Sequence, residues 1–206
     1  MQVHVNKTVL GCMIAAGAML AAPASAHEGG DWLVKAGVTH IAPKSNNGKI
    51  LDNTYKVDIG SSTRPSISLT YMATPNIGVE LLGAFPFKHD ISVQTLGNIG
   101  STKHLPPTLS VQWHFLPDAR IQPYVGVGLN YTTFFSTKSS AGSLKLDDSW
   151  GLAAQVGVDV QLTDRWFMNA DLRYIDIQSK AKLNGQYIGK VQIDPIVATV
   201  GIGYRF

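Results

Sequence analysis

Apolar and polar side chains alternate along the last segment of the chain, residues 196–206. The even-numbered positions from Ile196 to Phe206 carry Ile, Ala, Val, Ile, Tyr and Phe, whereas the odd-numbered positions are mostly small or polar and include Arg205. Because successive side chains of a β-strand point to opposite faces, this period of two predicts a strand with one apolar face. That face ends in aromatic residues, as is typical of the lipid-facing side of a transmembrane barrel strand.

Seven further segments share this alternation, and each is about as long as a tilted strand that crosses a bilayer. They are residues 32–41, 64–72, 77–88, 105–115, 123–135, 150–162 and 166–177. The segment 150–162 has the clearest pattern, with Trp, Leu, Ala and Val on the even positions and mostly Gly, Gln and Asp on the odd ones. The alternation therefore predicts an all-β chain with eight strands.

Short and long connections alternate between these segments. Residues 73–76, 116–122 and 163–165 are short turns, whereas residues 42–63, 89–104, 136–149 and 178–192 are long and polar. Outer-membrane barrels have short periplasmic turns and long extracellular loops, and an even number of strands places both termini in the periplasm. We therefore predict an eight-stranded antiparallel up-and-down transmembrane β-barrel in the cell outer membrane.

Aromatic residues gather on the apolar parity near both ends of the segments. A periplasmic girdle is predicted for Trp32, Tyr71, Phe115, Trp166, Tyr204 and Phe206, and an outer girdle for Phe85, Phe87, Phe135, Trp150 and Tyr174. Amphipathic rings favour the interface between membrane and water. A soluble β-sandwich, the alternative, would have to cover eight such faces and does not predict the alternation of loop lengths.

Residues 1–26 have the features of a secretory signal peptide. A positive charge and an apolar run precede Ala24-Ser25-Ala26, a cleavage motif of small residues. Cleavage before His27 is predicted, so the barrel would occupy residues 27–206. The single cysteine, Cys12, would leave with the signal peptide, and no disulfide is expected.

The charge of the chain is dispersed. The sequence has 17 basic and 14 acidic residues, without a basic stripe, and this excludes a nucleic-acid partner. Lys35, Glu80, Asp159, Asp171 and Arg205 lie on the parity that faces the barrel interior. Because charges in a narrow lumen must be paired, we expect these side chains to form a polar network. Eight strands enclose a filled interior or one small cavity rather than a wide channel.

Few residues are candidates for catalysis or metal binding. Ser110 and His114 are separated by about 13 Å along one strand, too far for a nucleophile and its base, so no enzyme activity is expected. The histidines of the mature chain, His27, His40, His89, His104 and His114, lack close ligand spacing. No metal centre and no cofactor are predicted, although His89, Asp90 and His104 share one extracellular loop and leave a weak surface metal site open.

The chain resembles the OmpW family of outer-membrane proteins, which includes the AlkL-type proteins for uptake of hydrophobic compounds. The resemblance rests on Y-M-A-T-P-N-I-G-V-E-L-L at 71–82, H-L-P-P-T-L at 104–109, the segments 123–135 and 148–159, and the terminal G-Y-R-F. It implies an eight-stranded barrel with a narrow apolar channel. Such a channel passes small hydrophobic molecules across the outer membrane, with lateral exit into the bilayer.

The resemblance also implies roles for single residues. Leu82 stands at a position where bulky apolar side chains close the floor of the family's channel. Arg173 stands where some members have a tryptophan, and this departure implies a different constriction and ligand range. The C-terminal Phe206 is similar to the signal that the outer-membrane assembly machinery reads. The expected partners are therefore outer-membrane lipid, small hydrophobic solutes and the assembly machinery.

A second function remains open from the sequence. A barrel with a closed lumen would serve envelope integrity, adhesion, or binding of bacteriocins or phage. A lumen packed shut by side chains would favour this alternative, and a lumen that accommodates a lipid tail would favour transport.

Overall fold

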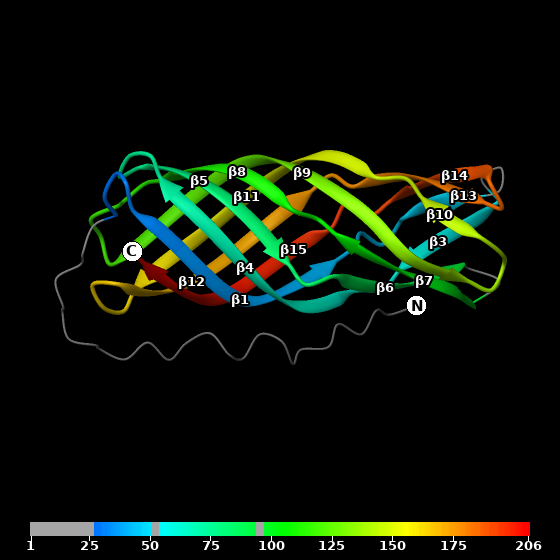
Figure 1. Cartoon of the computed structure of the whole chain (residues 1–206), viewed down its shortest axis with the longest axis horizontal. Helices are drawn as coiled ribbons and strands as arrows, with labels where there is room; N and C mark the ends of the chain where they lie inside the picture. The colour runs from blue at the N-terminus through cyan, green and yellow to red at the C-terminus, as the bar shows by residue number, and fades with distance from the viewer. Residues whose placement is uncertain (1–26, 51–53, 94–96) are drawn as a thin grey trace, which may run out of the picture.

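A computed structural model describes residues 27–50, 54–93 and 97–206, so the predicted signal peptide lies outside the described residues. The regular structure in these ranges consists of strands joined into one antiparallel sheet. Within them, no helix is long and apolar enough to cross a membrane. The sheet is rolled into an elongated barrel with the C-terminus at one end (Figure 1).

Eight strands form the closed part of the barrel. They are β1 (Trp32–Ala42), β4 (Ser62–Met72), β5 (Ile77–Ala84), β8 (Thr108–His114), β9 (Ile121–Ser139), β11 (Ser149–Gln161), β12 (Trp166–Ile175) and β15 (Ile196–Arg205). Each pairs with the next in chain order, and β15 pairs with β1. The predicted eight-stranded antiparallel barrel is therefore confirmed. Closure removes the free edges that a sheet would otherwise leave unpaired.

The alternation of the sequence places apolar side chains on the outer surface. In β11, Trp150, Leu152 and Val156 are exposed, whereas Gln155 and Asp159 are buried in the lumen. The exposed aromatic residues Trp32, Trp113 and Trp166 lie toward the end with the short turns. Because short turns are periplasmic in barrels of this kind, we assign this end to the periplasm.

Seven further strands lengthen the barrel at its other end. They are β2 (Gly48–Ile50), β3 (Tyr55–Ile59), β6 (Phe87–Val93), β7 (Gly97–Leu105), β10 (Leu144–Leu146), β13 (Gln178–Leu183) and β14 (Gln186–Gln192). They follow one another in the order β10-β13-β14-β2-β3-β6-β7-β9, and the outer part of β9 completes them (Figure 1). We call this group the outer extension. Most of the outer extension was predicted from the sequence to be polar loops, and that prediction is wrong.

The interpretation of residues 77–88 as one strand is also wrong. β5 ends at Ala84 and β6 begins at Phe87, on either side of Phe85-Pro86. Proline has no backbone N–H to donate to a ladder, so the strand breaks there and the alternation restarts. Phe85 is 67% exposed, in keeping with the outer girdle, but Phe87 is only 1% exposed and packs inside the outer extension.

Three groups of apolar residues fill the interior at different heights. Leu33, Met72 and Phe167 pack together near the periplasmic end. A larger group around Phe87 and Ile177 lies where the eight strands meet the outer extension. A third, around Val57 and Ile91, lies within the extension itself. Between the first and second groups the lumen is polar, and it contains the buried side chains of Lys35, Glu80 and Asp171.

Candidate functional site

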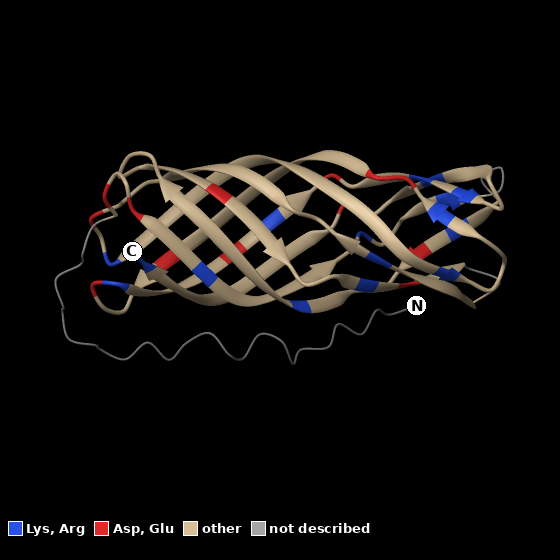
Figure 2. Ribbon diagram, viewed as in Figure 1, with Lys and Arg blue, Asp and Glu red and all other residues tan. Residues whose placement is uncertain are grey.

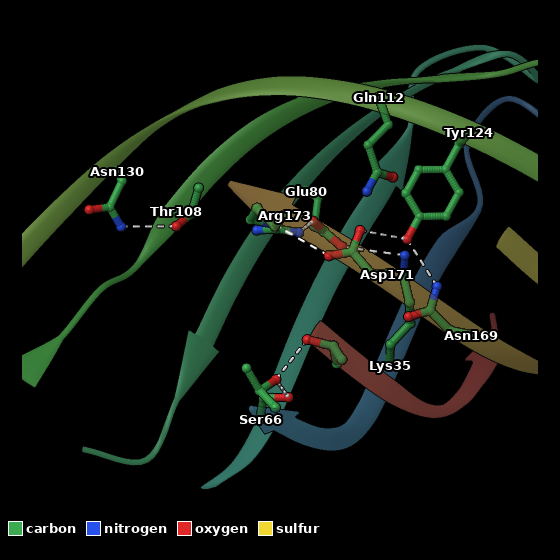
Figure 3. A network of polar contacts seen from close by, with 12 residues as sticks. Lys35, Ser66, Glu80, Thr108, Gln112, Tyr124, Asn130, Asn169, Asp171 and Arg173 are labelled. Carbon is green, nitrogen blue, oxygen red and sulfur yellow. Dashed lines mark hydrogen bonds and ion pairs between the residues drawn. The ribbon is translucent and has the colours of Figure 1, made fainter. Parts of the chain in front are cut away.

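Charged residues lie on several strands in the middle of the eight-stranded part (Figure 2), and the side chains of Lys35, Glu80, Asp171 and Arg173 are buried in the lumen. Arg173 of β12 donates from Nη2 to Oε2 of Glu80 on β5 at 2.7 Å. Lys35 of β1 places Nζ 3.3 Å from Oε1 of the same carboxylate. Nε of Arg173 also lies 3.5 Å from Oδ1 of Asp171. These four side chains, which we call the polar layer, come from three strands and converge on one point (Figure 3).

Tyr124 connects the polar layer to polar side chains on the periplasmic side of the layer. Its hydroxyl group donates to Oδ2 of Asp171 at 3.2 Å and accepts from Nδ2 of Asn169 at 3.0 Å. Asn169 donates in turn to Oδ1 of Asp159 at 2.7 Å. The ring of Tyr124 can lie across the lumen because Gly157 has no side chain, since a Cβ there would lie 2.3 Å from the ring. Tyr124 was not among the predicted network residues, although its lumen parity in segment 123–135 was a usable signal.

Leu82 and Arg173 both border a small void beside the polar layer. The void has a volume of about 10 Å³, so it has room for one water molecule at most. The lumen is therefore closed at this height. Asp159 is connected to the layer through Asn169 and Tyr124, and Arg205 lies apart at the periplasmic mouth, 3.7 Å from Asp31.

An apolar cavity of about 80 Å³ lies in the outer extension. Branched aliphatic side chains from β2, β3, β6, β7, β10, β13 and β14 line most of it, among them Ile50, Val57, Ile91, Val93, Ile99, Leu144, Leu146, Leu183, Ile188 and Val191. One water molecule needs roughly 10–15 Å³ of such a cavity, so the cavity has room for a small apolar molecule. None of the residues predicted for the solute path or the lumen network lines this cavity, because the sequence predicted polar loops here.

Two histidines form part of the cavity wall. The rings of His89 and His104 stack with their centroids 4.7 Å apart, and Nδ1 of His89 bonds to the carbonyl oxygen of Gly60. Burial, with a smaller effect of His89, lowers the pKa of His104 to about 3, and burial also lowers the pKa of His89. Both rings are therefore neutral at neutral pH and suit an apolar wall. The side chain of Asp90 is exposed and does not join them.

A seam separates β9 from β10 in the outer extension. Among the described strands these two share no backbone ladder, and a hollow of about 520 Å³ lies between them. Phe134 and Phe135 border the hollow on the side of β9. Leu144 and Leu146 of β10 border both the hollow and the apolar cavity. One layer of side chains thus separates the cavity from the outer surface.

One cluster in the described ranges offers three side chains suitable for a metal ion. His27, His114 and Asp159 lie together, fully buried, at the periplasmic end of the lumen. They are distant in the sequence, and therefore ligand spacing could not reveal them.

The closed strand ring, the exposed apolar outer face and the buried polar lumen define an outer-membrane β-barrel protein. The model of the OmpW family matches residues 28–206, and the chain belongs to this family. It is 42% identical to outer membrane protein W of Vibrio cholerae over 98% of this chain and 100% of that protein. It is 30% identical to outer membrane protein AlkL of Ectopseudomonas oleovorans over 100% of this chain and 96% of that protein.

The fold is also similar to solved structures of outer-membrane proteins. The crystal structure of OprG from Pseudomonas aeruginosa superimposes with a TM-score of 0.82 at 35% sequence identity. The match covers 88% of this chain and 98% of OprG. The relatives are barrel proteins of the outer membrane, which agrees with the predicted location.

Proposed function

We propose that the protein admits small hydrophobic solutes from outside the cell and releases them sideways into the outer membrane. The observation that carries this proposal is an apolar cavity on the outer side of a closed polar layer. The hydrophobic effect drives an apolar solute from water into such a cavity. The charged side chains below it oppose a straight path to the periplasm, because an apolar solute cannot replace the polar contacts of Glu80 and Arg173.

The seam between β9 and β10 supports a lateral exit. Leu144 and Leu146 are the side chains that separate the cavity from the hollow beside Phe134 and Phe135. Because β10 has a ladder partner only in β13 among the described strands, it can move away from β9 without breaking a strand ladder on that side. A solute that passes Leu146 reaches aromatic side chains near the outer girdle. Partitioning alone suffices as the driving force for this path.

Uptake of a hydrophobic solute by whole cells tests the proposal. A strain that lacks the protein is complemented with the wild type, with Leu146→Gln or with Lys145→Gln. Leu146→Gln places an amide in the cavity wall and is expected to reduce uptake. Lys145 is the exposed neighbour on the same strand, so Lys145→Gln is expected to leave uptake unchanged. Equal uptake by the deletion strain and the wild type would overturn the proposal.

The closed lumen also favours a second candidate, a structural or interaction protein. The outer extension carries exposed lysines that suit an anionic partner on the cell surface, namely Lys49, Lys56, Lys103, Lys138, Lys145, Lys180 and Lys190 (Figure 2). Replacing these lysines by glutamine would abolish binding of such a partner and leave solute uptake unchanged. If uptake falls and partner binding stays, the second candidate is refuted.

A further inference from the structure

Three buried side chains that the solute path does not use converge at the periplasmic end of the lumen. One ring nitrogen of His27, one of His114 and a carboxylate oxygen of Asp159 lie within 4.8 Å of one another. Nε2 of His27 is 3.8 Å from Oδ2 of Asp159, and the two imidazole rings are perpendicular with centroids 5.4 Å apart. All three residues have 0% exposed surface. They come from the segment before β1, from β8 and from β11.

Four polar atoms of this cluster have no hydrogen-bond partner among the described residues. Both ring nitrogens of His27, Nδ1 of His114 and Oδ2 of Asp159 are buried without a hydrogen bond. Buried polar atoms in folded proteins nearly always have a partner. These atoms therefore point to a ligand that one atom from each of the three residues could share.

Neighbouring residues orient two of the three side chains in the way that metal ligands are oriented. Nε2 of His114 lies 3.2 Å from Oε1 of Gln112. An amide oxygen only accepts, so Nε2 carries the proton and Nδ1 keeps its lone pair. Oδ1 of Asp159 accepts from Asn169, which leaves Oδ2 directed to His27. Metal-binding histidines usually donate their second N–H to an oxygen acceptor of this kind.

The charges of the lumen favour an added cation. In this part of the lumen the buried side chains of Glu80, Asp159 and Asp171 are acidic, and those of Lys35 and Arg173 are basic. Glu80 and Asp171 contact the cations of the polar layer directly, whereas the ion-pair contact of Asp159 among the described residues is with His27. Asp159 is therefore the acidic side chain that faces the two imidazoles and has room for a cation beside them.

We propose that His27, His114 and Asp159 bind one divalent transition-metal ion of the Zn²⁺ class. Two imidazoles and one carboxylate are a ligand set that zinc accepts, with a fourth position left for water. Ligand atoms around tetrahedral zinc are roughly 3.4 Å apart, so side-chain shifts of about 1 Å close the site. The ion would tie the segment before β1 to β8 and β11, two strands that do not pair with each other.

Zinc binding by the protein purified from outer membranes tests this proposal. The protein is stripped with a chelator in detergent and titrated with Zn²⁺ alone, with metal analysis and calorimetry as readouts. The expected result is one Zn²⁺ per chain and a raised unfolding temperature. His114→Ala and Asp159→Asn should weaken binding by about tenfold or more. His40→Ala, at an exposed site, and His104→Ala, in the cavity wall, should leave it unchanged.

Three outcomes would overturn the proposal. They are no Zn²⁺ bound by the wild type, affinity unchanged in both cluster variants, and loss of binding in His104→Ala alone. The first would mean that an imidazolium–carboxylate pair or a water molecule satisfies the cluster. A variant that fails to fold is recognised by its lost heat-modifiable shift on a gel. In that case X-ray absorption of the zinc-loaded wild type tests the ligand set directly, because the proposed site requires two imidazole ligands.

Discussion

Substituting Glu80 by glutamine removes the charge that holds the polar layer together. Its two carboxylate oxygens contact different cations, Arg173 at 2.7 Å and Lys35 at 3.3 Å. Glutamine has nearly the same volume and can still accept from Arg173. The substitution therefore changes charge with little change in packing, and it leaves Lys35 and Arg173 with Asp171 and Asp159 as the remaining anions.

The expected cost follows from these distances. With an effective dielectric constant of about 20, attraction across 2.7 Å and 3.3 Å amounts to roughly 6 and 5 kcal/mol. Desolvation of the buried ions offsets much of this attraction, and breaking a buried pair typically costs about 3–5 kcal/mol. We expect Glu80→Gln to lower the free energy of unfolding by that amount. The double variant with Lys35→Met removes one uncompensated cation and should be more stable than the sum of the single changes by about 1–3 kcal/mol.

Reversible unfolding by urea in lipid vesicles, followed by tryptophan fluorescence, measures these free energies. The control is Asp90→Asn in the exposed pair with Lys88, whose charged atoms are 3.9 Å apart. An exposed pair contributes about 1 kcal/mol or less. A cost for Glu80→Gln as small as that of the control, or strict additivity in the double variant, would refute the account of the polar layer.

Three further predictions concern other parts of the molecule. Val156 is 53% exposed on the outer face of β11, so Val156→Arg should destabilise the barrel by about 2–4 kcal/mol in a urea titration. The control, Leu162→Arg at the periplasmic end of the same face, should cost about 0–1 kcal/mol. Equal costs would mean that the assigned membrane depth is wrong. The backbone N–H of Phe206 bonds to the carbonyl oxygen of Trp32. Deleting Phe206 should slow insertion, measured by the heat-modifiable gel shift over time, more than it lowers the stability of the finished barrel. Normal assembly would count against its role as an assembly signal. Because burial lowers the pKa of His104 to about 3, the unfolded chain takes up a proton below pH 6.5 that the folded chain does not, and stability falls as the pH falls. At pH 5 the contribution of His104 to this loss should be about 2 kcal/mol relative to pH 7. The pH dependence of His104→Phe should be weaker by that amount, with the buried His89 still contributing; an unchanged pH dependence in the variant would exclude His104 as a source.

The sequence by itself determined the class of fold. In β11 and β15 the strict alternation identified the lipid face and the lumen face, because the side-chain period of a strand is two regardless of its neighbours. The short turns at 73–76 and 163–165 indicated which end of the barrel faces the periplasm, because turn length is also visible in the local sequence. The parity also placed Lys35, Glu80 and Asp171 in the interior before their partners were visible.

The partners themselves were decided only by the tertiary structure. Glu80 and Arg173 are 93 residues apart, and their contact depends on how far β5 and β12 are staggered around the ring. The sequence states the parity of each strand but not this stagger, so it could not show that the lumen is closed beside Leu82. For the same reason the sequence could not show that His27, His114 and Asp159 lie close together.

The outer extension was likewise decided by tertiary structure. β2 and β10 have three residues each, too few for alternation to be recognised, and such short strands persist only because neighbouring strands pair with them. The break at Pro86 also turned Phe87 inward, where a continuous pattern would have placed it in the outer girdle. Local periodicity thus identified the eight spanning strands, and long-range pairing built the apolar cavity, its seam and the polar layer beneath them.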